Sequence, residues 1–474
     1  MSFMERTSNI ERRTSNSECE RRPHRWALVV RCSMFDVSVC ALCVMIAGVR
    51  PARAQETNRT PYPIDLPTAL RLAGAQNLDI KIAREKLAEA RANQSGADFQ
   101  FFPSLSPGIT YFQHDGNIQD VAGNINDVHK YSYAAGGALA AQVNFGDAIY
   151  KSLAAKQLTR AAGHGLEAQT QDSVLAAAQG YFDLAFAQAA VGVAQESVKI
   201  SAGYEAQIQS AVEAGIAFKG DALRVRVQTE RNRLALRQAA EQQRVAAARL
   251  AQILHLDPAV ELAAQDSDLA PLALIATNAA LDSVVQQTLA NRPELKQSQA
   301  LAAAARDARN GATYGPLIPS LGAQAFWGGL GGGKSGGSDS FGGQEDYVVG
   351  LSWRIGPGGL FDSSRIHSSE ARLNVAKLDS EKLHDDLARQ AVEAFTRWQA
   401  LGEQLGTAQR ALAAAEEGLR LAEQRKEFAV GVVLETIQAE QDLTQARLDY
   451  ANVVAEFNKA QYALNKLTEA PESR

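Results

Sequence analysis

The segment from Gly328 to Ser335 has the residue types of a phosphate-binding loop, because it matches the pattern G-x-x-x-x-G-K-S. A working loop of this kind opens a helix, and the N-terminus of that helix holds the phosphate. The residues that follow, 336–343, are Gly-Gly-Ser-Asp-Ser-Phe-Gly-Gly, which cannot form a helix. We therefore reject nucleotide binding. The segment is interpreted as an exterior loop between the third and fourth strands of a sheet, with residues 114–130 as its counterpart earlier in the chain.

No other group of residues has the spacing of a catalytic or metal site. All four cysteines lie within the first 43 residues, which excludes Cys-zinc sites and cysteine nucleophiles from the rest of the chain. The histidines after residue 54 form no H-E-x-x-H motif, and there is no G-x-S-x-G nucleophile elbow. The formal net charge of −5 provides no basic footprint for nucleic acid. The sequence therefore predicts no enzyme, no cofactor, no metal and no nucleic-acid partner.

Residues 1–54 predict a signal peptide. Arg21, Arg22 and Arg25 form a basic region, and residues 37–49 form an apolar run that is too short to span a bilayer. Ala52-Arg53-Ala54 then supplies the small-x-small cleavage pattern. We expect an exported protein whose mature chain begins at residue 55.

The distribution of proline predicts very long helices. Proline is absent from residues 108–257 and 358–470, and both stretches are rich in Ala, Gln, Glu, Arg and Leu. Two long helices of about 100 Å and two shorter returning helices fit these stretches. Their expected ranges are 148–213, 219–256, 363–429 and 434–468.

The last of these helices carries a heptad pattern, in which apolar residues alternate at spacings of four and three. This pattern predicts an antiparallel coiled-coil seam. The seam residues are Ala439, Leu443, Ala446, Tyr450, Val453, Phe457, Ala460, Leu464 and Leu467.

Three separated landmarks recur at an offset of 216 residues, which indicates an internal tandem duplication. They are the strand openers at 102–105 and 318–321, the pair Phe145 and Phe361, and the turn glycines Gly215 and Gly431. We expect one repeat at 65–258 and a second at 280–468. The remaining segments are an N-terminal linker (55–64), an inter-repeat linker (259–279) and a C-terminal tail (469–474).

Each repeat is predicted to run helix, strand, strand, long helix, shorter helix, with the first helix at Pro67–Asp98. Residues 131–145 and 346–355 alternate with a period of two and place aromatic residues on one face. This alternation is typical of membrane β-barrel strands, although a soluble sheet with one buried face has the same pattern. The aromatic residues predicted to face the membrane are Tyr131, Tyr133, Trp327, Tyr347 and Trp353.

Four strands cannot close a barrel, because about eight are the practical minimum. A membrane sheet must nevertheless close, since open edges leave backbone groups unsatisfied in lipid. Each subunit must therefore contribute its four strands to a shared barrel, and three subunits would supply twelve.

These features together resemble the TolC-like outer-membrane efflux protein family over about residues 64–468. The resemblance rests on an ordered, duplicated set of motifs: 66–70 with 77–80, 291–295, the two strand openers, 358–362, and the turns 214–217 and 430–433. It implies a mainly α protein with a small β part: a homotrimer with a twelve-stranded barrel in outer-membrane lipid and a long α-barrel across the periplasm. The protein would be a passive exit duct in tripartite efflux or type I secretion, opened by a periplasmic adaptor and an inner-membrane pump.

The resemblance also implies a site at the periplasmic tip, where the turns between long and short helices dock the adaptor and constrict the closed pore. Gly215 and Gly431 match the turn glycines, and Asp221 and Glu435 match acidic positions just after them. Carboxylate rings at a narrow pore favour cations. The second turn is about two residues shorter than in the best-known member, and Gln438 stands where a second acid would be.

One alternative from a different class remains, a periplasmic coiled-coil scaffold without a pore. A channel requires an outward apolar face on all four strands, whereas a scaffold does not.

Overall fold

The computed structural model describes most of the chain after the predicted signal peptide, which itself lies outside the described residues. Residues 59–474 form one compact unit, and all that follows concerns it. The described residues are 62–102, 104–257, 259–265, 269–276, 279–334, 339–427 and 433–469.

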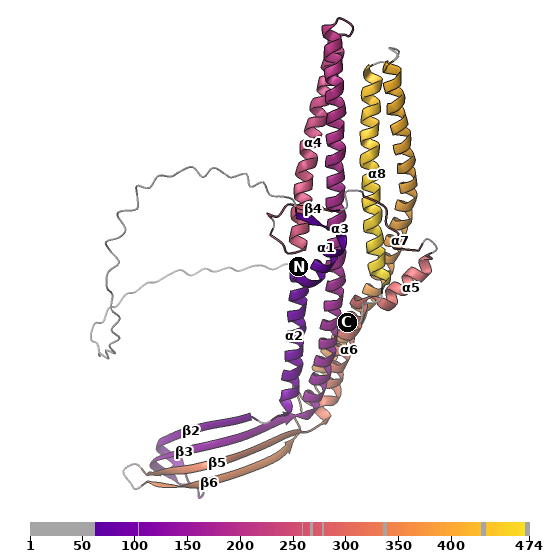
Figure 1. Cartoon of the computed structure of the whole chain (residues 1–474). Helices are drawn as coiled ribbons and strands as arrows, with labels where there is room; N and C mark the ends of the chain where they lie inside the picture. The colour runs from indigo at the N-terminus through magenta and orange to yellow at the C-terminus, as the bar shows by residue number, and fades with distance from the viewer. Residues whose placement is uncertain are drawn as a thin grey trace, which may run out of the picture. The chain divides into compact units, whose positions relative to one another are not determined.

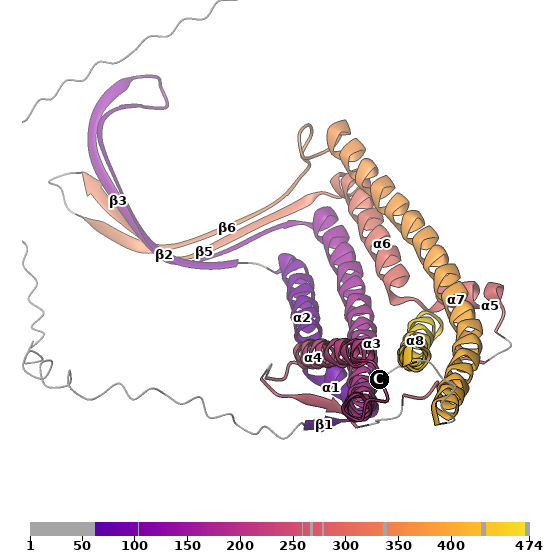
Figure 2. The ribbon, with the colours of Figure 1, turned by 90° about the horizontal axis from the view of Figure 1, so that it is seen from above.

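Four long strands form one antiparallel sheet at one end of this unit, in the order β2-β3-β5-β6 (Figure 1). The strands are β2 (Ser104–Gln119), β3 (Ile125–Asn144), β5 (Ser320–Lys334) and β6 (Ser340–Ser352). The sheet is strongly curved when seen from above (Figure 2). Strands β2 and β6 are its edges, so each has one side without a partner strand within the protomer.

These strands are longer than the sequence predicted, and two predicted loops are wrong. Residues 328–334 belong to β5 rather than to an exterior loop, and most of residues 114–130 belong to β2 and β3. The glycines of β5 make room for rings from its neighbours. A Cβ on Gly331 would lie 2.5 Å from the Tyr133 ring, and a Cβ on Gly329 would overlap the ring of Phe341. A strand at this position also excludes the phosphate-loop geometry.

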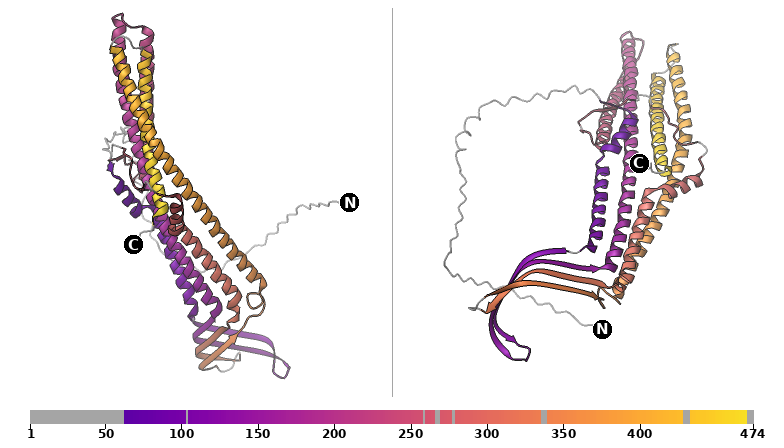
Figure 3. Two further views of the ribbon diagram at one scale, coloured as in Figure 1. Left: turned by 90° about the vertical axis from the view of Figure 1, so that its right-hand side faces the viewer. Right: turned by 60° about the horizontal axis from the view of Figure 1, so that its bottom comes forward.

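The long and shorter helices occur as predicted, to within a few residues. They are α3 (Phe145–Glu213), α4 (Lys219–Ile253), α7 (Ser363–Glu427) and α8 (Val433–Thr468). Helix α4 packs back along α3, α8 packs back along α7, and α8 also contacts α3 (Figures 1 and 3). The contact between α3 and α8 joins the two predicted repeats.

The helix predicted at Pro67–Asp98 is in fact two helices, α1 (Leu66–Gln76) and α2 (Leu78–Asp98). Asn77 separates them because its backbone is extended, with ψ of 132°. Its side chain accepts from the Asp79 N–H (2.7 Å) and donates to the Ile253 carbonyl (3.1 Å). The break therefore anchors the chain to the end of α4.

The second predicted repeat has a corresponding break between α5 (Leu281–Asn291) and α6 (Pro293–Tyr314). Here Arg292 precedes a proline, and a residue in that position is disfavoured in the helical conformation. Short 3₁₀ segments, η1 (Phe99–Phe101) and η2 (Gly315–Leu317), then lead into the strands. The same order of elements thus occurs twice along the chain.

The main apolar core lies beside the middle of α3. Two short strands, β1 (Tyr62–Ile64) and β4 (Leu262–Ala264), pair in parallel there, although both fall in segments predicted as linkers. The two strands pack against α1, α3 and α4. Ile64 of β1 lies in this core with Leu184 of α3, Leu250 of α4 and Leu254 just after α4, each at most 1% exposed. This core fixes the middle of α3 against its neighbours.

Among the described helices, α3 alone is long and apolar enough to cross a membrane by length and composition. Nearly half of its most apolar stretch is buried inside the protein, and a core helix passes the same test. With 69 residues it is about 100 Å long, far more than the roughly 30 Å of bilayer hydrocarbon. Its apolar stretch is explained by the core described above.

Candidate functional site: a one-sided sheet and the helical tips

The register of the sheet places four of the five predicted aromatic residues on one face. Residues directly opposite in an antiparallel pair share a face, and successive residues alternate. Tyr133 lies opposite Gly331 and Ala325 lies opposite Tyr347, so odd-numbered residues of β3, β5 and β6 share this face. Tyr131 and Trp327 are odd-numbered members of the same strands. The fifth residue, Trp353, follows the end of β6.

The aromatic side chains of this face contact one another across strands. Trp327 Nε1 donates to the Tyr347 hydroxyl (2.8 Å), and their rings meet edge to face. Tyr111 stacks on Tyr131 with ring centroids 6.4 Å apart. Trp353 differs, because its indole donates to the Leu317 carbonyl at the junction of strands and helices (3.3 Å). The prediction that Trp353 belongs to the strand is therefore wrong.

The two faces of the sheet differ in chemistry. The odd-numbered face is mostly apolar, with exposed Ile109, Val349 and Leu351 besides the aromatic residues. The even-numbered face carries most of the polar side chains. These include Lys130, Ser132, Gln142, Asn144, Ser320, Gln324, Lys334, Gln344, Asp346 and Ser352. A sheet of this kind is suited to separate lipid from water.

The first predicted tip turn lies at the far end of α3 and α4 from the sheet (Figure 1). Gly215 has φ of +74°, a conformation that glycine adopts without strain at a helix end. The N–H groups of Gly215 and Ile216 donate to the carbonyls of Val212 (3.0 Å) and Ala211 (2.8 Å). The turn therefore ends α3 with its last carbonyl groups satisfied. Gly431 of the second turn lies outside the described residues.

Asp221 and Glu435 occupy equivalent positions, in the first turns of α4 and α8. Asp221 is not the N-cap, because Phe218 occupies that position. Each carboxylate pairs with an arginine: Asp221 with Arg224 (3.2 Å) and Glu435 with Arg425 of α7 (2.6 Å). These partly exposed pairs are weak, contributing about 0.2–1 kcal/mol, so both carboxylates can also attract ions from solution. Gln438, one turn further along α8, is exposed.

The helices behind the tips are joined by a small cluster that the sequence did not predict. Tyr204 of α3, Val225 of α4 and Ile437 of α8 are buried together. Burial raises the pKa of the Tyr204 hydroxyl, the nearby Asp221 carboxylate raises it further, and a hydrogen bond with Thr436 opposes the shift. The first turns of α8 are thereby attached to both α3 and α4.

A carboxylate lies buried about one turn beyond this cluster. Glu440 of α8 is 3% exposed and accepts hydrogen bonds from α3 and α4. Sequence analysis missed it because the residues that bury it are more than 200 positions away along the chain. The sequence feature that could have indicated a buried polar site is the pair of small polar residues Ser197 and Ser201, which are one helical turn apart.

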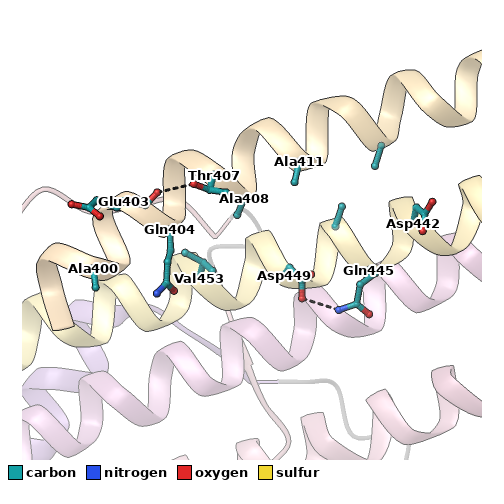
Figure 4. Close-up of a pocket in the computed structure, with 12 residues that line it drawn as sticks. Ala400, Glu403, Gln404, Thr407, Ala408, Ala411, Asp442, Gln445, Asp449 and Val453 are labelled. Atoms are coloured by element: carbon teal, nitrogen blue, oxygen red, sulfur yellow. Dashed lines mark hydrogen bonds between the residues drawn. The ribbon is translucent and has the colours of Figure 1, made fainter.

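A cavity of 720 Å³ lies between α7 and α8. Alanines such as Ala408 and Ala411 line it together with polar side chains such as Gln445 and Asp449 (Figure 4). Gln445 donates to Asp449 (2.8 Å) within it. The lining has no nucleophile paired with a base, and no group of three metal-ligating side chains occurs in the described part of the chain.

A one-sided sheet joined to helices about 100 Å long is the architecture expected of an outer-membrane channel with a helical extension. Residues 284–469 match the sequence model of the outer membrane efflux protein family. A comparison with curated proteins gave no match.

Solved structures of membrane proteins, outer-membrane channels among them, have the same fold. A membrane protein from Pseudomonas aeruginosa superposes with a TM-score of 0.75 at 18% identity, covering 86% of this chain and 91% of that one. The Campylobacter jejuni channel CmeC gives 0.72 at 14% identity, covering 86% and 87%. The Vibrio cholerae outer membrane protein VceC gives 0.70 at 16% identity, covering 86% and 97%.

Residues 284–469 are thus an outer membrane efflux protein domain, and the chain has the TolC-like fold of the outer-membrane channels. This family and fold support an exit duct for efflux, located in the outer membrane with a helical extension into the periplasm. The family is defined by efflux rather than by a catalytic activity.

Proposed function

We propose that this protein works as a homotrimer whose three sheets close into one twelve-stranded barrel in the outer membrane. The observation that carries the proposal is the sheet itself. It has a mostly apolar odd-numbered face, and its edge strands β2 and β6 each lack a partner within the protomer. Open edges leave backbone groups unsatisfied in lipid, so β6 of one protomer must pair with β2 of the next.

The dimensions agree with this proposal. The alternating stretch 131–143 of β3 has 13 residues, and a tilted transmembrane strand needs about 9–11. The even-numbered polar face would line the water-filled lumen. A scaffold without a pore would have no use for a face that is mostly apolar and exposed, as at Ile109, Val349 and Leu351.

We further propose that the duct serves tripartite efflux or type I secretion, together with a periplasmic adaptor and an inner-membrane pump. The tips at the α3–α4 and α7–α8 turns would dock the adaptor and form the constriction. Support comes from exposed apolar side chains at the first tip, Ile216 and Phe218, and from the carboxylates Asp221 and Glu435 beside the turns.

Single-channel conductance of the mature protein in planar bilayers tests the proposal, with wild type compared with the Asp221→Ala/Glu435→Ala double variant. We expect discrete pores whose cation preference falls in the variant, because two carboxylates per protomer are lost from the constriction. The effect should be several-fold smaller in high salt, since exposed charges are screened. Gln438→Ala, which removes no charge, is the matched control and should leave the cation preference unchanged.

The remaining outcomes separate the parts of the proposal. Pores with unchanged ion preference in the double variant would keep the channel and remove the tip carboxylates from the constriction. A folded protein that needs no detergent and forms no pores would contradict the channel and favour the scaffold.

A further inference from the structure

A network of neutral polar side chains surrounds Glu440 between α3, α4 and α8. Asn232 Nδ2 of α4 donates to Glu440 Oε1 (3.1 Å) and to Ser201 Oγ of α3 (3.0 Å). Ser197 Oγ, also of α3, donates to the same carboxyl oxygen (3.4 Å). All four side chains are at most 9% exposed. The carboxyl group thus joins a helix of the second repeat to two helices of the first.

Two glutamines extend the network. Gln441 Nε2, next to Glu440 on α8, donates to Gln228 Oε1 on α4 (2.7 Å). Gln228 Nε2 in turn donates to Asn232 Oδ1 (2.9 Å). The Asn232 side-chain amide is therefore fixed with its Nδ2 toward Glu440. It can donate to a carboxyl oxygen but cannot supply a positive charge.

No cation pairs with Glu440 among the described residues. The side chains that donate hydrogen bonds to it, Ser197 and Asn232, are both neutral. The basic side chains of the helices packed around it pair elsewhere or are exposed, and Tyr204, the nearby titratable group of α3, is engaged with Thr436. The pairs are Lys199 with Glu196 on α3 (3.9 Å), Arg233 with Glu230 on α4 (2.6 Å), Arg420 with Glu417 on α7, and Arg447 of α8 with Glu416 of α7 (3.9 Å). Arg226 and Arg231 of α4 are exposed.

A buried carboxylate without a cation is costly, so burial favours the protonated form. Burial raises the pKa of Glu440 to about 7, and the hydrogen bonds from Ser197 and Asn232 oppose the shift. A glutamate in water titrates near pH 4.3, so separation of α8 from α3 and α4 would restore a low pKa. Protonation therefore stabilises the packed arrangement, and that stabilisation is lost as the pH rises from about 4.3 through about 7.

We infer that Glu440 is a proton-binding residue that positions α8 on the α3–α4 pair and so controls how easily the periplasmic tip opens. Glu440 lies within the first three turns of α8, so loosening these turns frees the start of the helix, which follows the second predicted tip turn in the sequence. The protonated side chain holds α8 in place, whereas the carboxylate leaves an unpaired charge between the repeats and favours release. The inference rests on the proposed function, because only in a duct does movement of the tip change a pore.

The test compares wild type with Glu440→Gln in the trimeric full-length mature protein between pH 6 and pH 8. Two quantities are measured: hydrogen exchange of residues 433–446, corrected for the intrinsic effect of pH, and the open probability of single pores. In wild type we expect the opening equilibrium to rise about tenfold over this range. In Glu440→Gln, which mimics the protonated side chain, both quantities should stay at the wild-type pH 6 level.

Two further variants sharpen the test. Glu417→Gln makes the same chemical change on an exposed glutamate of α7 and should keep the wild-type pH profile. Asn232→Asp places a second carboxyl group beside Glu440, which raises proton affinity, so its profile should shift to higher pH. A general destabilisation of the protein could not produce both results, loss of the pH dependence in Glu440→Gln and its shift to higher pH in Asn232→Asp.

The outcomes distinguish this inference from the proposed function. Pores that open while exchange of 433–446 is independent of pH would overturn the inference and leave the duct intact. The inference about Glu440 would also be overturned if Glu440→Gln kept the wild-type pH dependence. Absence of pores together with the expected exchange pattern would support the proton-binding role and contradict the duct.

Discussion

Val349→Lys is expected to reduce assembly in the membrane strongly, whereas Val348→Lys should be tolerated. These two valines are neighbours on the edge strand β6, and both are well exposed in the protomer, at 75% and 61%. Val349 lies opposite Ala323 on the apolar odd-numbered face, and Val348 lies opposite Gln324 on the polar face. A lysine on the lipid-facing side of a barrel costs up to about 2–4 kcal/mol, depending on its depth in the bilayer, and a trimer carries three copies.

The free energy of unfolding from lipid vesicles is the measurement, together with the amount of trimer recovered from outer membranes. The pair is well matched because the substitution, the strand and the exposure are nearly the same, and only the face differs. Equal losses in both variants would contradict the assignment of faces. A larger loss for Val348→Lys would reverse it and place the polar face toward lipid.

The faces of the strands could be predicted from sequence because alternation is a local property. Tyr131 and Tyr133 fall on one side of β3 whatever the neighbouring strand does. Trp353 was misplaced because alternation continues past the point where pairing stops. The last ladder partner of β6 is Ser352, and the chain then turns toward α7, which the local pattern does not reveal.

The length of β5 was underestimated for a nonlocal reason. Glycine has a low intrinsic preference for strands, so the run at 328–333 favours a loop when taken alone. In the folded sheet the ring of Tyr133 covers Gly331 and the ring of Phe341 covers Gly329. These rings belong to other strands, and that of Tyr133 comes from the other predicted repeat. Only the register brings them to the glycines.

The long helices were predictable because absence of proline and abundance of helix-forming residues are both visible in the sequence, and the last helix adds a heptad pattern. The helix break at Asn77 was not, since an asparagine is only moderately unfavourable within a helix. The break is set by a long-range contact, the hydrogen bond from its side chain to the Ile253 carbonyl. Glu440 was missed for the same reason, because its burial depends on Ser197 and Asn232 of the other repeat.

Gly146→Ala is expected to disrupt the junction between the sheet and α3, with Gly163→Ala in the same helix as its control. A Cβ on Gly146 would overlap the carbonyl oxygen of Gly315 and lie 2.6 Å from the carbonyl carbon. Both atoms belong to the backbone, so relief requires the start of α3 to move away from η2. Overpacking of this kind costs about 1–3 kcal/mol, and occasionally more.

The consequence should extend beyond stability, because this junction sets the angle at which strands leave the helices. In the same region Asp147 of α3 pairs with Arg365 of α7 (2.7 Å), so displacement of α3 also strains a link between the repeats. Gly163 has no atom within 4 Å of an added Cβ, and alanine there should stabilise α3 by about 0.5–1 kcal/mol. Unfolding midpoints in detergent and trimer yield measure both effects. If Gly146→Ala matched Gly163→Ala in both, the close approach of α3 and η2 would not be what fixes the junction.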